Sequence, residues 1–108
     1  MQLVQIQTDF EYGNRSTEVS ATPVANIETA QKALMSLVTK AFKKYDITVT
    51  PVVDDANYRS IENDDETVDC SGDDHYCIST LKKPSATDAV AELVIEENAL
   101  SIEWYLVE

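Results

Sequence analysis

The sequence has few of the residues from which small active sites are usually built. Its 108 residues include two glycines, one histidine and two cysteines. With so few glycines there is no glycine-rich loop to cradle a phosphate, and no serine stands in a Gly-x-Ser-x-Gly nucleophile motif. These absences predict a protein that is not an enzyme and that needs no cofactor.

Long apolar runs are also missing. A transmembrane helix needs about 20 apolar residues in a row, and no segment of the chain approaches that length. The first residues show no basic cluster followed by an apolar run, so no signal peptide is expected. The length is close to the commonest domain size. The sequence therefore predicts a cytoplasmic protein with a single domain spanning residues 1–108.

Basic residues are scarce, and the acidic ones are unevenly distributed. Eight Lys and Arg stand against 20 Asp and Glu, which gives a net charge of -12. Residues 1–53 hold five acids and five bases, residues 54–74 hold nine acids and one base, and residues 88–108 hold six acids and no base. Such a surface repels nucleic acids and anionic membranes, so neither is expected to bind directly. The expected partner is a basic protein surface.

The cysteines and the histidine do not form a recognisable chemical site. Cys70 and Cys77 enclose six residues, which is not the spacing of a CxxC motif, and only His75 stands near them as a third ligand. A disulfide could join the two cysteines, but a cytoplasmic pair stays reduced, and the neighbouring aspartates disfavour a thiolate. The acids also lack the register of an EF-hand calcium loop. No metal site is expected, and His75 is interpreted as a surface residue at the start of a strand.

The first half of the chain predicts strands and one long helix. Residues 3–12 alternate between apolar and polar side chains, and Gly13 and Asn14 suit a turn into a return strand at residues 16–21. Asn26 is the expected N-cap of an amphipathic helix over residues 27–45, and the β-branched residues 47–53 predict a further strand. We expect the helix to place Leu34, Leu37, Val38 and Ala41 on a sheet face that contains Val4, Ile6, Ile102 and Trp104.

The second half begins with the acidic stretch, residues 54–74, which is expected to be a loop because it is long and polar. Tyr58 and Ile61 are its sizeable apolar residues, and we expect them to hold its middle against the body of the protein. Residues 76–81 and 100–107 predict strands. Residues 86–97 are compatible with a strand or a helix, and the alternation of their side chains favours the strand.

These elements predict an α+β fold with two layers, an antiparallel sheet of about four to six strands packed against one long helix. If residues 86–97 form a helix instead, the order of elements becomes the ferredoxin-like β-α-β-β-α-β.

Carboxylates in a row are the feature of the sequence with the clearest functional meaning. In the strand interpretation Glu92 and Glu96 share a face with Glu103, and in the helix interpretation Asp88, Glu92 and Glu96 form a stripe. DNA also presents a rigid row of negative charges, so such a protein could occupy a nucleic-acid-binding groove. The predicted partner-binding residues are Asp64, Asp65, Glu66, Asp69, Asp73 and Asp74 in the loop and Glu92, Glu96, Glu97 and Glu103 in the tail.

In size and charge alone, the chain resembles the small acidic inhibitors, carried by phages and plasmids, that block host defence nucleases. The resemblance implies a non-enzymatic anti-defence inhibitor that mimics nucleic acid and binds a basic, nucleic-acid-binding protein such as a nuclease. One alternative is an immunity protein that neutralises a toxin, and another is a regulatory or structural subunit whose charge serves only solubility. A small enzyme that uses His75 and neighbouring aspartates is a further alternative. A homo-oligomer is compatible with all of these.

Overall fold

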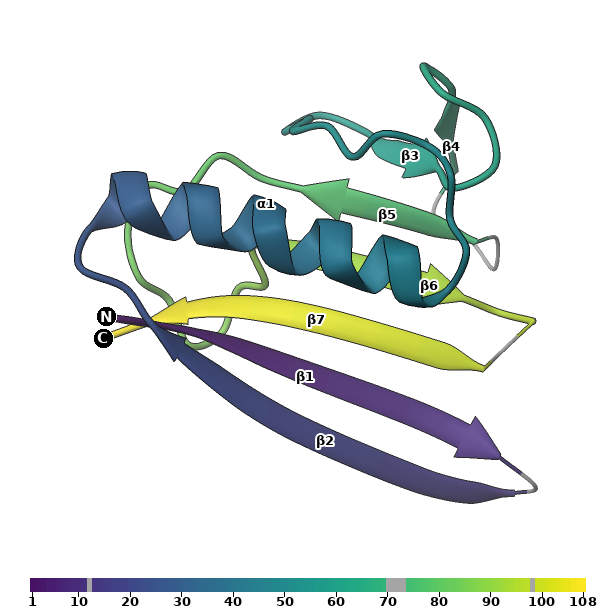
Figure 1. Cartoon of the computed structure of the whole chain (residues 1–108), viewed down its shortest axis with the longest axis horizontal. Helices are drawn as coiled ribbons and strands as arrows, with labels where there is room; N and C mark the ends of the chain where they lie inside the picture. Colours follow the sequence, from purple (N-terminus) through teal and green to yellow (C-terminus); the bar gives the residue numbers. More distant parts are fainter. Residues whose placement is uncertain (12, 70–73, 98) are drawn as a thin grey trace.

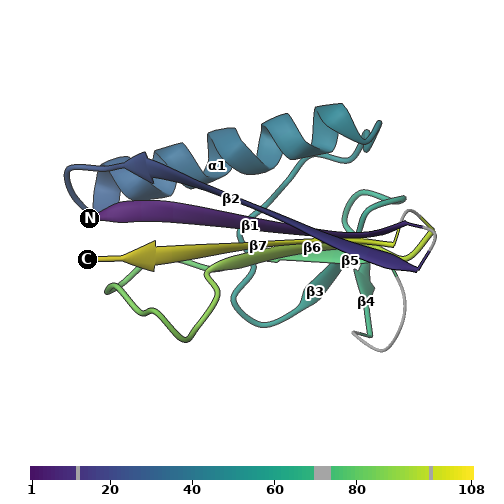
Figure 2. The same ribbon diagram turned by 90° about the horizontal axis from the view of Figure 1, so that it is seen from below.

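The computed structural model is described for residues 1–11, 13–69, 74–97 and 99–108. In this part of the chain a single sheet and a single helix form two layers (Figure 1, Figure 2). The elements are β1 (Gln2–Glu11), β2 (Asn14–Pro23), α1 (Ile27–Lys44), β3 (Tyr58–Ser60), β4 (Thr67–Val68), β5 (His75–Ile78), β6 (Ala91–Ile95) and β7 (Leu100–Val107).

All seven described strands belong to one antiparallel sheet, in the order β2-β1-β7-β6-β5-β3-β4. The α+β class and the two-layer arrangement are as predicted, and the strands are more numerous than the four to six expected. The element order differs from the ferredoxin-like alternative, because residues 86–97 contain the strand β6 and not a second helix. No helix in the described ranges is long and apolar enough to cross a membrane.

The predicted hairpin and helix are both present, although β2 extends beyond the predicted residues 16–21 at both ends. Gly13 turns the chain between β1 and β2 with a φ of 79°, in the left-handed region that glycine tolerates. Asn26 caps α1, since its Oδ1 accepts a hydrogen bond from Thr29 N–H at 2.9 Å while Thr29 Oγ1 accepts one from Asn26 N–H at 3.1 Å. The side of α1 that faces the sheet buries Leu34, Val38, Ala41 and Phe42, while Leu37 is half-buried at the border.

The face of β1 that meets the helix is the opposite of the one predicted. Gln5 lies across from Trp104 and Ile6 across from Glu103, and residues opposite each other in an antiparallel pair share a face. Trp104 is fully buried in the core. Gln5 and Gln7 therefore face α1, and the prediction that Val4 and Ile6 face it is wrong, whereas Ile102 and Trp104 are buried as predicted.

Two hydrogen bonds explain why glutamines point inward. Trp104 Nε1–H donates to Gln5 Oε1 at 2.8 Å, and the Gln7 amide donates to the hydroxyl of Tyr45, just beyond α1, at 2.9 Å. A buried indole N–H without an acceptor would cost about 1 to 3 kcal/mol. The alternation along β1 predicts a strand but does not tell which of its faces meets the helix. That face depends on Gln5, which supplies the acceptor for the buried indole N–H of Trp104.

Residues 47–53 form a connection and not the predicted strand. Thr50 N–H donates to Asp64 Oδ1 at 2.9 Å, and Val52 N–H donates to the Tyr76 hydroxyl at 3.2 Å. Pro51 between them has no N–H to donate. The Thr50 and Val52 donors are thus bound by side chains, and the Ile47 N–H donates to the Phe42 carbonyl at 2.8 Å, so the β-branched composition of this segment does not lead to a strand.

The second half of the chain contains two strands that were not predicted, in addition to the predicted ones. The acidic stretch includes β3 and β4, and Ile61 is buried in the core as expected. The strand predicted at residues 76–81 is β5, which is shorter and begins one residue earlier. Of residues 86–97, only Ala91–Ile95 form the strand β6. β7 matches its prediction, with Leu100, Ile102, Trp104 and Leu106 all buried.

Candidate protein-binding interface

A hollow at one end of the sheet is lined by acids from both acidic parts of the sequence. It has a volume of about 420 Å³ and lies between the residues that join β3 to β4, the start of β5 and the turn after β6. None of the lining residues that the structure describes is basic. We call it the acidic hollow; its lining consists of Ser60, Glu62, Asn63, Glu66, Val68, Asp74, Glu96 and Glu97.

Strand pairing explains how acids from distant parts of the sequence meet there. Ser60 of β3 lies opposite His75 of β5, which in turn lies opposite Val94 of β6. The residues that follow Ser60, precede His75 and follow Val94 therefore meet at one end of these strands. Asp74 Oδ1 accepts a hydrogen bond from Glu96 N–H at 2.7 Å. This bond fixes the two acidic segments relative to each other.

Two acids of residues 54–74 are engaged in hydrogen bonds that hold the chain together. Asp54 accepts hydrogen bonds from Ala56 N–H and from Arg59 Nη1 at 3.0 and 2.9 Å, and these contacts, the first of them most, lower its pKa below the ordinary value. Asp55 accepts from the backbone N–H and the hydroxyl of Thr80, which lower its pKa as well. The two aspartates thus anchor the segment that precedes the acidic hollow.

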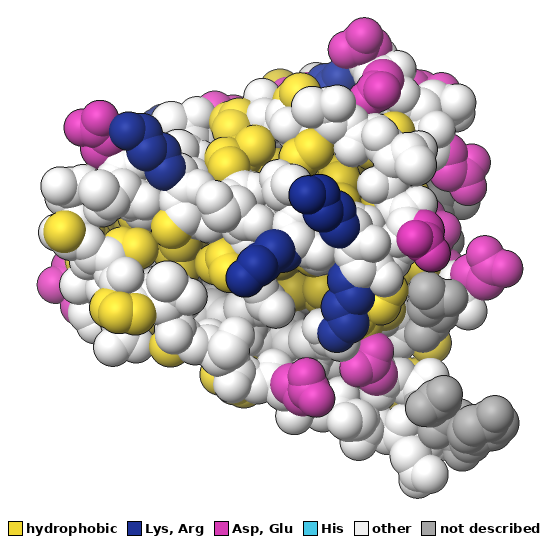
Figure 3. All heavy atoms as spheres, viewed as in Figure 1, with side chains coloured by type: hydrophobic (Ala, Val, Ile, Leu, Met, Phe, Trp, Pro, Cys, Tyr) yellow, Lys and Arg dark blue, Asp and Glu magenta, His cyan; other side chains and the backbone are white. Residues whose placement is uncertain are grey.

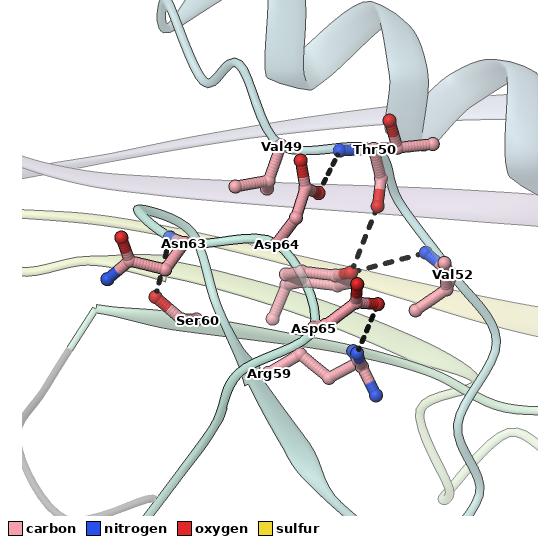
Figure 4. Close-up of a pocket in the computed structure, with 9 residues that line it drawn as sticks. Val49, Thr50, Val52, Arg59, Ser60, Asn63, Asp64 and Asp65 are labelled. Atoms are coloured by element: carbon pink, nitrogen blue, oxygen red, sulfur yellow. Dashed lines mark hydrogen bonds and ion pairs between the residues drawn. The ribbon is translucent and has the colours of Figure 1, made fainter.

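A second hollow, of about 250 Å³, lies between the residues after α1 and residues 59–65 (Figure 4). Asp64 points toward the backbone N–H of Thr50, and Arg59 lies with Nη2 at 3.8 Å from Asp65 Oδ1. The hydroxyl of Tyr76 bonds the backbone of Thr50 and Val52. Because its charged groups and this hydroxyl already have partners within the chain, we interpret this hollow as an anchor for the loop and not as a ligand site.

Glu92 and Glu103 lie elsewhere, on the sheet face away from α1. They stand directly opposite each other on β6 and β7. Glu92 Oε1 lies 3.2 Å from His75 Nε2, and Glu103 Oε2 accepts a hydrogen bond from the Tyr105 hydroxyl at 2.7 Å. That bond, with a smaller effect of desolvation, raises the pKa of Tyr105 to about 12. Each carboxylate is thus oriented by a neighbour on the same face.

His75 is buried, which corrects its interpretation as a surface residue. Only 5% of it is exposed. The ring of Tyr58 packs edge-on against it, with ring centroids 5.0 Å apart, and Glu92 lies at its Nε2. Cys77, two residues further along β5 and half-buried, has a pKa raised to about 11, first by desolvation and then by the charge of Glu92. Neither side chain is therefore presented to solvent as a reactive group.

The predicted row of Glu92, Glu96 and Glu103 is formed only in part, because Glu96 lies beyond the end of β6 and joins the acidic hollow. Two other predicted loop residues, Asp65 and Asp69, are exposed outside it. Glu62 lines the hollow although it was not among the predicted residues, and its position in the same acidic run was the signal available. The predicted residue Asp73 and the thiol of Cys70 lie outside the described residues.

Charges of the two signs are unevenly distributed over the face that α1 covers. On the face that α1 covers, lysine side chains lie over the helix, and acidic side chains lie mainly toward the side of β3 and β4, with a few below the helix and at its left end (Figure 3). The exposed lysines near the end of α1 are Lys40, Lys43 and Lys44. On this face, acidic side chains are therefore more numerous toward β3 and β4 than over α1.

Within the described ranges, no group of three or more His, Cys, Asp or Glu side chains is placed to hold a metal ion. The carboxylates of the acidic hollow are thus spread along a surface and do not form a compact cage. No family model matches the chain, and neither a curated protein nor a solved structure does.

Proposed function

We propose that the protein is a non-enzymatic inhibitor that binds a basic protein through the acidic hollow, with a nucleic-acid-binding protein as the expected target. One observation carries the proposal: five carboxylates from two separate acidic segments line one hollow, and none of its described lining residues is basic. Concentrated charge of one sign attracts a basic surface and speeds its association. A groove built for rows of phosphates carries the complementary charge.

The backbone around the hollow favours binding because much of it is ordered beforehand. Glu96 is held by the hydrogen bond to Asp74, and the Ala99 N–H donates to the Glu96 carbonyl at 3.0 Å, which closes the turn. Acids on an ordered turn lose less conformational entropy on binding than acids on a flexible loop. The hollow is large enough to admit the end of a lysine or arginine side chain from the partner.

The strength of binding should come from several charges acting together. An exposed ion pair contributes about 0 to 1 kcal/mol, and salt screens it over about 8 Å at physiological concentration. A single charge reversal in the hollow should therefore weaken binding slightly. Reversal of three neighbouring charges should abolish it, because the attraction becomes repulsion.

The test compares two variants with the same change in net charge. One carries Glu66→Lys, Glu96→Lys and Glu97→Lys in the hollow, and the control carries Glu28→Lys, Asp88→Lys and Glu108→Lys on other exposed positions. Both are checked for folding by circular dichroism and used in pull-downs from lysate of the source organism. The captured protein is identified, purified and titrated at several salt concentrations, with its nucleic-acid binding measured in parallel.

The proposal predicts that the control binds a basic partner and blocks its nucleic-acid binding, whereas the hollow variant does neither. Equal binding by both variants with a flat salt dependence would contradict it and favour a regulatory or structural subunit. A partner that is a toxin, bound at its catalytic cleft without effect on nucleic-acid binding, would contradict it in favour of an immunity protein.

A further inference from the structure

The two edges of the sheet are very different. β4, at one edge, has two residues, whereas β2, at the other, has ten and pairs with β1 in register from Asn14 to Pro23 without a bulge. Nine of these ten residues are exposed. A long, regular edge strand presents unpaired backbone groups to another chain, and proteins usually blunt such edges with short strands, bulges or several charges. β4 is blunted by its shortness, whereas β2 is long and carries only Arg15, Glu18 and the terminal Pro23 against such pairing.

The direction of the free backbone groups of β2 follows from two hydrogen bonds. Phe10 N–H donates to Ala99 O, away from β2, so Phe10 and its partner Arg15 form a pair without mutual hydrogen bonds. Val24 N–H donates to Met1 O, toward β1, which fits the same alternation. The backbone groups that point outward from β2 are therefore those of Arg15, Thr17, Val19, Ala21 and Pro23.

Pro23 is placed where such an edge tolerates it. Its nitrogen would point outward, so its missing N–H removes nothing from the ladder with β1. The outward donors before it are intact, and its carbonyl can still accept a hydrogen bond. The free edge thus ends at Pro23 and offers an uninterrupted run of donors and acceptors before it.

We propose that β2 pairs antiparallel with β2 of a second copy of this chain, with the twofold axis at Val19. In this register Val19 faces Val19 of the partner subunit. Thr17 faces Ala21 of the partner subunit, and Arg15 faces Pro23 of the partner subunit. The outward groups then form about eight backbone hydrogen bonds across the axis. The seven-stranded sheets of the two copies join into one continuous sheet, and this assembly does not depend on the proposed inhibitory function.

Charge selects this register over its nearest competitor. An axis at Glu18 keeps the same overlap but sets Glu18 opposite Glu18 of the partner subunit, and like charges directly opposite each other are destabilising. With the axis at Val19, Glu18 faces Ser20 of the partner subunit instead. A shift by a single residue in the pairing would place side chains on the wrong faces, because the two faces alternate along each strand.

In this register Glu18 comes close to two lysines, Lys40 and Lys44, of the other copy. Ser20 lines a hollow with Lys40, Lys44 and Tyr45 on the helix side of the sheet. A side chain opposite Ser20 has its Cβ about 5 Å away, within reach of both lysines. Among the described residues, neither Glu18 nor these lysines form an ion pair within the chain. The pairing therefore forms this contact twice, once on each side of the axis.

The opposite face adds apolar contact, and the helices do not obstruct it. Val19 is 65% exposed and lies across from the half-buried Ile6 on the face away from α1. Around the axis these residues of both copies form one apolar cluster. β2 lies at the margin of the sheet, beyond the part that α1 covers (Figure 1). The axis also lies in the neutral first half of the sequence, far from the acidic hollow in strand order.

The first test measures mass in solution by sedimentation equilibrium over low micromolar to millimolar concentration. The parent should approach twice the monomer mass of 12.0 kDa as concentration rises. Val19→Lys should raise the dissociation constant at least about tenfold, because two lysines then face each other across the axis. The matched control is Val53→Lys, the same exchange at an exposed valine outside β2, and it should dimerise like the parent.

The second test reads the register and the ion pair. In a background with Cys70→Ser and Cys77→Ser, Val19→Cys should form a disulfide-linked dimer on mild oxidation, whereas Thr17→Cys alone should not. Glu18→Lys should weaken the dimer, and adding Lys40→Glu with Lys44→Glu should restore it. A folded parent that stays monomeric at millimolar concentration would overturn the proposal, as would a Val19→Lys variant that dimerises as well as Val53→Lys.

Discussion

The hydrogen bond between Trp104 and Gln5 offers the sharpest test of why β1 turns its glutamines inward. The indole N–H is fully buried and donates to the Gln5 amide at 2.8 Å. We predict that Gln5→Met, which keeps the length of the side chain but removes the acceptor, costs about 1 to 3 kcal/mol of unfolding free energy. The matched control is Gln2→Met, at an exposed position of the same strand, which should cost less than about 0.5 kcal/mol.

A double-mutant cycle separates the hydrogen bond from packing. Trp104→Phe removes the donor, so Gln5→Met in that background should be nearly neutral, and the coupling between the two sites should be about 1 to 2 kcal/mol. The free energies come from urea denaturation followed by circular dichroism, with the slope of each transition checked for constancy. If Gln5→Met costs the same in both backgrounds to within about 0.3 kcal/mol, the indole does not select the inner face of β1.

Two further predictions concern the core and the thiol. Leu34→Ala should cost about 2 to 5 kcal/mol because Leu34 is fully buried between α1 and the sheet. Leu37→Ala, at the half-buried border of the helix, should cost less in the same denaturation assay; the reverse order would mean that the wrong helix face meets the sheet. In a Cys70→Ser variant, the alkylation of folded Cys77 should be slow at neutral pH, because desolvation and the charge of Glu92 raise the pKa of the thiol to about 11. The alkylation rate should keep rising up to about pH 11. A rate that levels off near pH 9.0, the ordinary pKa of a thiol, would contradict this.

The sequence predicted elements well where local signals act alone. The capping pattern at Asn26 and the spacing of Leu34, Val38 and Ala41 located α1 to within one residue at its end. The alternation in residues 100–107 located β7 and its buried face correctly. In these segments the periodicity of the side chains and the direction of the core agree, so the pattern was sufficient.

The predictions that proved wrong are those in which a side chain far away in the sequence determines the local structure. The inner face of β1 depends on an acceptor for Trp104, and the connection at residues 47–53 depends on Asp64 and on the Tyr76 hydroxyl. His75 is buried because strand pairing brings Tyr58 and Glu92 against it. None of these contacts is visible in the local sequence, because each joins residues more than ten positions apart.

The candidate interface was predictable in composition but not in shape. The acidic segments and most of the acids that line the hollow could be named from charge alone. That these acids line one hollow could not be predicted, since it requires the pairing of β3 with β5 and of β5 with β6. The same pairing separates Glu96 from Glu92 and Glu103, because β6 ends at Ile95 and the chain turns there.

The position of β7 has a consequence for how the chain is made. β7 lies between β1 and β6, so it joins the β1–β2 hairpin to the remaining four strands of the sheet. It is also the last of the seven strands to leave the ribosome. Until it does, the first and sixth strands each have an edge without a partner, and the core lacks Ile102, Trp104 and Leu106. The nascent chain therefore holds an unfinished sheet until β7 has emerged, while its open edges are exposed to aggregation and to chaperones.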